Sequence, residues 1–388
     1  MLPVSVLAVG GVIFLSLFAI SASGRASAGR NDFLPFYAGG RLAFSGHLYD
    51  QQRVLAEERS AAGVAGESLH FIRPPWFAAL LWPLARLPYL MAYRLWELLM
   101  VLAIAFFAIF WSPPGRVANL VALCFSVPAL AALVNGQDTP LLLAWITLSA
   151  LLARRGRWFA AGLALALCQT KFHLFLPLWI VLVAARQWRA LAGLASGNAV
   201  LACVSAAVAG LRWPNEYLAS IGRDAVTPGA EHMPTFFHAI AGLGPPDWWP
   251  LLAAALVACA AWAAGRRLDP ETALLIAPAL AMPFLNHTYV FDAVVLLPLL
   301  MRSLSASATA IRLTAVFLLT PIPWIGCFAG YPGTLPAAVT VLVLISTYIR
   351  LRTVPVAADE GYCTGGSTVV TKEAISVDGP FSCQPARR

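Results

Sequence analysis

The sequence contains little charge. Only 11% of its 388 residues are Asp, Glu, Lys or Arg, whereas 60% are hydrophobic and the mean hydropathy is +0.76. This leaves too little polar surface to cover a globule of this size in water, so the composition excludes a soluble protein. Charge-free segments of ~20 residues predict membrane spans instead. These segments cover residues 117–137, 190–211, 271–291 and 313–349, the last of which is long enough for two spans.

The fold class that we expect is therefore all-α, a polytopic bundle of transmembrane helices. A β-barrel would need ~10-residue stretches of alternating polarity. The apolar segments of this chain are instead rich in Leu, Ala and Val on every side. The region 1–352 is predicted to form one transmembrane domain. The polar, Gly- and Ser-rich segment 353–388 is predicted to be a disordered cytoplasmic tail.

Motifs for several kinds of chemistry are also missing. The chain has no Gly-rich phosphate loop, nucleotide fingerprint, HExxH or G-x-S-x-G, so the sequence does not support a mechanism that uses ATP or a nucleotide sugar. Five of the seven cysteines lie singly in apolar segments, without metal-ligand spacing. We expect no metal and no other cofactor. The net charge of +8 comes from short basic clusters between apolar segments, which are topology signals, so no nucleic-acid partner is expected.

The basic clusters predict the orientation of the chain through the positive-inside rule. With residues 154–157, 186–189, 266–267, 302–312 and 350–352 inside, the outer segments are 25–74, 135–138, 169–173, 212–248 and 286–289. This scheme needs about 12 crossings. Within it, residues 74–88 form a 15-residue apolar stretch that reaches only ~22 Å of a ~30 Å core, so we expect it to dip into the membrane or break. The first segment is expected to be a retained span, since no basic residue precedes Arg25.

One acidic residue stands at the start of an aromatic helical pattern. In "NDFLPFYAGGRLAF", the apolar residues at 33, 36, 37, 40 and 44 fall on one face of a helix, which predicts a helix lying on the membrane surface. Asp32 directly precedes this helix. On spacing alone, Asp32 is interpreted as an N-cap worth ~1 kcal/mol.

Several segments together resemble glycosyltransferase family 87 of the GT-C superfamily. They are Asp32 with "YAGG", then "SGHLYD" at 45–50, "PPWFAALLWPLARLP" at 74–88, "NGQDTPLLL" at 135–143 and "LALCQTKFHLFLPLWIVLVAARQWRA" at 165–190. The resemblance covers roughly residues 1–300. The chain departs from the family pattern at Arg73, where an aromatic residue is common, and at Phe172, where Pro is frequent. It also has Asp138 and Thr139 after Gly-Gln, where Asn is common. These departures bear on the donor sugar and the acceptor site.

The resemblance implies a polyprenyl-phosphate-linked sugar, often mannose, as the donor, and Asp32 as the catalytic residue. The acceptor would be a lipid or glycan. A sugar phosphate already carries a good leaving group, so an inverting transfer needs only one carboxylate to take the proton of the acceptor hydroxyl. Cations would stabilise the departing phosphate. The candidates for phosphate binding are Arg73, Lys171, His173 and His287. The candidates for the substrate pocket are Tyr37, Tyr49, Gln137, Asp138 and Asp292.

Each candidate also has a structural interpretation. Arg73 and Lys171 are long cations that could reach the membrane interface, and Asp138 could cap the helix that starts at Thr139. His173 could be a structural hydrogen-bonding group, Asp292 could belong to a structural ion pair, and Asp50 could supply a second acid. At the level of the whole protein, the alternatives are a transporter or flippase for a lipid-linked sugar and a scaffold without activity. We expect a multi-pass protein of the cell (plasma or inner) membrane, with its site on the outer, periplasmic or extracellular, side.

Overall fold

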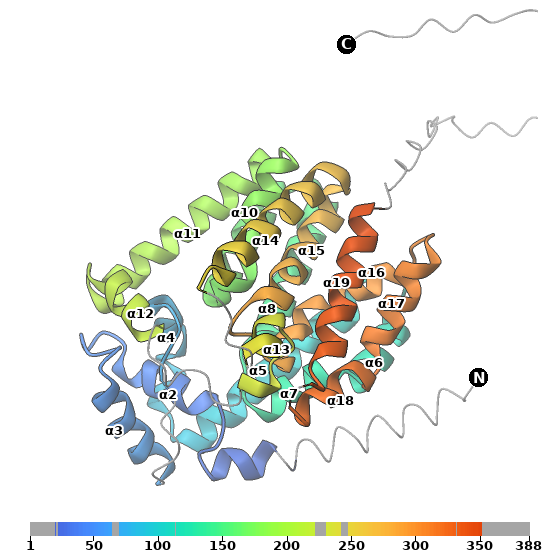
Figure 1. Cartoon of the computed structure of the whole chain (residues 1–388). Coiled ribbons are helices and arrows are strands. Elements are labelled where there is room, and N and C mark those ends of the chain that lie inside the picture. Colours follow the sequence, from blue (N-terminus) through green and yellow to red (C-terminus); the bar gives the residue numbers. More distant parts are fainter. Residues whose placement is uncertain are drawn as a thin grey trace, which may run out of the picture. The chain divides into compact units, whose positions relative to one another are not determined.

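The computed structural model describes residues 20, 22–63, 70–112, 114–221, 230–241, 247–330 and 332–350 (Figure 1). The predicted first span and the predicted tail at 353–388 lie outside these ranges, apart from the end of the first segment. Every regular element in the described ranges is a helix, which confirms the all-α class.

The first half of the chain contains α2 (Phe33–Leu42), α3 (Gln51–Ala62), α4 (Pro75–Leu81), η1 (Leu84–Arg86), α5 (Tyr89–Phe110), α6 (Arg116–Cys124), α7 (Val127–Val134), α8 (Thr139–Arg154), α9 (Trp158–Ala166), η2 (Leu167–Lys171), α10 (Phe172–Ala184) and α11 (Trp188–Ala209), where η denotes a 3-10 helix. The second half contains α12 (Trp213–Ile221), η4 (Ala230–His232), α13 (Phe236–Ala241), α14 (Trp249–Arg267), α15 (Pro270–Ala281), η5 (Met282–Phe284), η6 (Val290–Leu296), α16 (Leu297–Ser303), α17 (Thr309–Leu319), α18 (Ile322–Phe328) and α19 (Leu335–Arg350).

Four helical segments in the described ranges are long and apolar enough to cross a membrane: α5, residues 158–184, α11 and α14. Two bent pairs, α6 with α7 at 61° and α17 with α18 at 42°, raise the number to six if each pair is one span. The chain is therefore a membrane protein by the length and composition of its helices. The count of about 12 crossings remains a prediction.

The segment 74–88 breaks as its length suggested. Its helix α4 has only 7 residues and is followed by the 3-residue η1, so α4 extends for only ~10 Å. The next helix, α5, has 22 residues and is long enough to span. Pro74 and Pro75 mark the start of α4, where proline costs no intrahelical hydrogen bond.

Residues 158–184 fold back on themselves at η2. A Cβ atom added to Gly162 would collide with the carbonyl oxygen of Ala190, so these two residues are in direct contact. In a straight helix Gly162 would lie about 33 Å from Ala184, whereas the six residues from Ala184 to Ala190 can span only ~20 Å. The chain therefore bends sharply at η2, so that the end of α10 returns toward α9, and residues 158–184 have the length and composition of one span without being straight. Lys171, the last residue of η2, lies at the turn between α9 and α10.

Glycines allow the close contact that holds this hairpin in place. A Cβ atom at Gly193 of α11 would collide with the carbonyl oxygen of Phe159 in α9, as one at Gly162 would with α11. The two backbones thus approach more closely than helices with larger residues could. On its other side, α10 packs against α14 and α15 (Figure 1). The hairpin turn is consequently held by helices on both sides.

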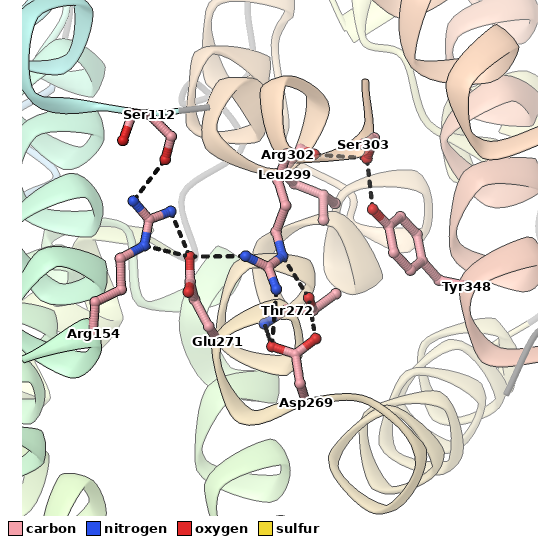
Figure 2. A network of polar contacts seen from close by, with 9 residues as sticks. All are labelled: Ser112, Arg154, Asp269, Glu271, Thr272, Leu299, Arg302, Ser303 and Tyr348. Atoms are coloured by element: carbon pink, nitrogen blue, oxygen red, sulfur yellow. Dashed lines mark hydrogen bonds and ion pairs between the residues drawn. The ribbon is translucent and has the colours of Figure 1, made fainter. Parts of the chain in front are cut away.

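Opposite this turn, arginines and carboxylates join three helices (Figure 2). Arg154 of α8 contacts Glu271 of α15 at 2.7 Å, and Arg302 of α16 contacts the same carboxylate at 3.2 Å. Arg302 also contacts Asp269 at 3.2 Å. The positive-inside rule assigned Arg154 and Arg302 to one side, and here they share one partner. Next to Arg302, Ser303 and the Tyr348 hydroxyl are 2.8 Å apart, which ties α16 to α19.

Helix α2 forms where it was predicted, but its aromatic face packs on protein. Phe33 is fully buried and stacks on Trp96 of α5 with ring centroids 5.5 Å apart, and Phe36 packs edge-on against the same ring. Only Phe44, past the end of the helix, is exposed. The prediction that this face lies on the membrane surface is wrong, because the aromatic side chains of α5 cover it.

Candidate functional site

Six polar side chains from five parts of the chain meet in one cluster, which we call the charged cluster. Its members are Asp32 before α2, Arg73 before α4, Gln137 and Asp138 between α7 and α8, Lys171 at the hairpin turn and Asp292 in η6. All six were candidates from the sequence. The structure thus brings together parts of the segments 25–74, 135–138 and 169–173, which the topology scheme placed on one side.

Asp32 does not cap α2. Its side chain makes no capping hydrogen bond, although it occupies the N-cap position. The neighbouring Asn31 does this instead, since its Oδ1 accepts from the backbone N–H groups of Phe33 at 2.9 Å and Leu34 at 3.2 Å. The N-cap interpretation of Asp32 is therefore wrong. Its carboxylate accepts a hydrogen bond from the Gln137 amide, and its backbone N–H donates to Asn135 O at 2.8 Å.

Arg73 and Asp138 form a buried ion pair with two hydrogen bonds. Arg73 donates from Nε to Oδ2 at 2.9 Å and from Nη2 to Oδ1 at 3.0 Å. Both residues are buried, and the guanidinium lies 5.0 Å from the centre of the Phe36 ring. The interpretation that Arg73 extends to the membrane interface is therefore wrong. Asp138 likewise makes no side-chain cap of α8.

Lys171 pairs with Asp292. Its Nζ lies 2.5 Å from Asp292 Oδ1 and 3.8 Å from Asp138 Oδ1, and it is 4.9 Å from the centre of the Phe291 ring. Lys171 is buried, so it does not reach the interface either. The second oxygen of Asp292 accepts from Tyr289 N at 2.9 Å, which holds the start of η6 beside the cluster.

Two histidines lie next to the charged cluster in sequence. The rings of His173 and His287 meet edge to face with centroids 6.0 Å apart, and His287 packs edge-on against Tyr289 at 5.2 Å. The buried Nε2 of His173 has no hydrogen-bond partner in the described part of the chain. The hydrogen-bonding capacity of that atom is therefore unused among the described residues.

Three other candidates are used in the packing of the outer segment. Tyr37 donates its hydroxyl to Leu87 O at 2.8 Å, and Tyr49 donates to Arg73 O at 2.8 Å. Tyr49 thereby holds the backbone beneath the Arg73 side chain. Asp50 caps α3, accepting from the backbone N–H groups at 52 and 53, so it supplies no second acid to the cluster. Among the residues described, no group of three or more His, Cys, Asp or Glu is arranged to hold a metal ion.

Electrostatics at Asp32 combine burial with nearby cations. Burial raises the pKa of Asp32 above its ordinary value, and the Gln137 hydrogen bond, followed by Lys171, Arg73 and Arg25, opposes this rise without cancelling it. A carboxylate in these surroundings is a stronger base than an exposed one.

Asn31 and Phe291 were not among the residues predicted for the site, and Phe36 was predicted only as part of the apolar face of its helix. Asn31 could have been found, because Asn caps helices as well as Asp and the pair "ND" offers both. No signal in the sequence shows that Phe36 and Phe291 face Arg73 and Lys171.

The fold and the site together define a helical membrane protein with a charged cluster buried between its helices. The model of glycosyltransferase family 87 matches residues 71–286, more than half of the chain, so the chain belongs to this family of membrane glycosyltransferases. No curated protein and no solved structure matches the chain. The matched region includes Arg73, Gln137, Asp138 and Lys171, whereas Asp32 and Asp292 lie outside it.

Proposed function

We propose that the protein transfers a hexose, such as mannose, from a polyprenyl-phosphate donor to a hydroxyl of a lipid or glycan acceptor, with inversion. One observation carries this proposal. Asn31 caps α2, which leaves the Asp32 carboxylate free to face a cluster that holds two buried cations. Membership of a glycosyltransferase family favours an enzyme over a transporter or flippase.

In the proposed mechanism Asp32 is the general base. The acceptor oxygen attacks the anomeric carbon while Asp32 takes the hydroxyl proton, and the bond between that carbon and the phosphate oxygen breaks. The electron pair of this bond leaves with the polyprenyl phosphate, and the proton remains on Asp32. The raised pKa of Asp32 brings its proton affinity closer to working pH, which favours proton transfer.

Lys171 and Arg73 are the proposed partners of the lipid phosphate. Both cations are paired with carboxylates, yet each has a hydrogen-bond donor left over among the residues described. Lys171 Nζ donates two hydrogen bonds, and Arg73 Nη1 has no hydrogen-bond partner in the described ranges. A phosphate oxygen could share these donors, and its negative charge would be stabilised as the sugar departs. In this proposal His173 and His287 contact the donor beside the phosphate.

The donor class can be tested with purified protein in lipid vesicles that contain native membrane lipids and glycans as acceptors. We expect transfer of labelled mannose or another hexose from a polyprenyl-phosphate donor, and no transfer from the matching nucleotide sugar. The reason is that the leaving group must reach the buried cations from within the bilayer. Transfer from the nucleotide sugar alone would contradict the proposed donor class.

We further propose that the charged cluster faces the outer side of the cell membrane. In a variant without native cysteines, His47→Cys should react with an impermeant thiol reagent in intact cells, whereas Arg155→Cys should react only after the cells are opened. Both residues are exposed in the structure, so access to the reagent depends on the membrane alone. Labelling of position 155 from outside would contradict this orientation.

A further inference from the structure

The side-chain amide of Gln137 is bound at both of its ends. Its Oε1 lies 3.3 Å from Lys171 Nζ and 3.5 Å from Arg73 Nη2, and its Nε2 donates to Asp32 Oδ2. Gln137 is buried. It is thus a member of the charged cluster that contacts the proposed base and both proposed phosphate partners.

These contacts fix the orientation of the amide. Lys171 and Arg73 can only donate hydrogen bonds, so they require the carbonyl oxygen of Gln137 on their side. The NH2 group then points toward Asp32, the third side chain to which Gln137 is hydrogen-bonded in the described part of the chain. An amide turned the other way would place its oxygen against a carboxylate and its nitrogen against two cations.

We propose that Gln137 is a positioning residue that holds the Asp32 carboxylate in place and links it to the cations of the phosphate site. This inference rests on the proposed function and adds a residue to it. A phosphate that accepts hydrogen bonds from Lys171 and Arg73 would weaken their bonds to the Gln137 carbonyl oxygen. The same amide would transmit this change to Asp32. Donor binding and base orientation are thus coupled by one side chain.

Several charged groups around Asp32 act on it through their charge. The cations Lys171, Arg73 and Arg25 face it from three different segments and lower its proton affinity. Tyr289 approaches from the segment before η6. Gln137 donates the side-chain hydrogen bond that favours the ionised carboxylate, so its loss must raise the pKa of Asp32.

The test compares pH profiles of kcat/KM for sugar transfer from polyprenyl-phosphate mannose. In the wild type, we expect activity to fall at low pH as Asp32 takes up a proton. Gln137→Met has a side chain of similar length but no amide. We expect it to move this acid limb up by about 1 to 2 pH units, because losing a hydrogen bond to a charged carboxylate raises the pKa by about that amount. The rate at neutral pH should fall by ~10-fold or more.

Two further variants sharpen the result. Gln137→Glu keeps oxygens for Lys171 and Arg73, so the fold should persist, but it places a second carboxylate beside Asp32 and should move the acid limb higher than Met does. Gln187→Met, just before α11 at the other end of the hairpin, changes the same residue type away from the cluster and should leave the profile unchanged.

An acid limb that stays in place in both Gln137 variants would overturn this inference, even if their rates fell, because a purely structural role would not move it. The proposed function fails in a different way. If the wild-type profile has no acid limb that depends on Asp32, then Asp32 is not the base, and the inference about Gln137 fails with it.

Discussion

Asp32→Asn is expected to lower sugar transfer from a polyprenyl-phosphate donor by ~10²- to 10⁴-fold while the protein stays folded. The asparagine cannot accept the proton of the acceptor hydroxyl, although its oxygen can still accept from the Gln137 amide. Since Asp32 makes no capping bond, the substitution removes no cap. The melting temperature should therefore stay within a few degrees of wild type.

Asn31→Ala is the matched control, one residue earlier. It removes both capping hydrogen bonds of α2 and the 2.9 Å contact with the Tyr89 hydroxyl, so it should cost ~1 kcal/mol or more in stability. The Asp32 carboxylate remains, and transfer per folded molecule should change by only a few fold. Asp32→Asn should thus lower the rate with little loss of stability, whereas Asn31→Ala should lower stability with little loss of rate. Near-normal transfer by Asp32→Asn would leave a different base or an inactive scaffold as the explanation.

Lys171→Met is expected to have the second largest effect. It removes a charge from the proposed phosphate site, which should lower the rate about tenfold to a hundredfold if the contact acts in the transition state. It also leaves the buried Asp292 without its 2.5 Å partner, which should cost ~3 to 5 kcal/mol of stability. Thermal unfolding in detergent and transfer per folded molecule measure the two effects separately.

A double variant separates the charge of Lys171 from its structural contribution. Lys171→Met with Asp292→Asn removes both charges of the pair, so most of the lost stability should return while transfer stays low. Arg41→Met, which breaks the exposed pair between Arg41 and Glu57, should cost ~0 to 1 kcal/mol and leave transfer unchanged. Recovery of transfer in the double variant would show that Lys171 only neutralises Asp292.

The membrane helices, and the segments that contribute side chains to the charged cluster, could be predicted from the sequence for physical reasons. Long apolar segments have few stable arrangements in a bilayer, so composition defines the class of fold. Basic clusters orient these segments, and the same scheme places residues 25–74, 135–138 and 169–173 together. Side chains from all three segments meet in the charged cluster. The short α4 also followed from length alone.

Pairing between side chains could not be predicted in this way. Arg73 and Asp138 are 65 residues apart, and Lys171 and Asp292 are 121 apart, so no local spacing links them. Hydropathy also cannot distinguish a helix face that meets lipid from one that meets aromatic protein residues, which is why α2 was assigned to the membrane surface. The cap of α2 depended on which of two adjacent side chains turned toward the backbone, and propensity does not separate Asn from Asp.

The separation of Lys171 and Asp292 has a consequence for biosynthesis. Because a chain is made from its N-terminus, Lys171 emerges 121 residues before the carboxylate that lies closest to it in the finished protein. During that interval Asp138 is its nearest available counter-charge, and Arg73 already competes for it. A lysine without a partner is costly in apolar surroundings. The charge of Lys171 is therefore balanced as in the finished protein only after Asp292 of η6 has been made.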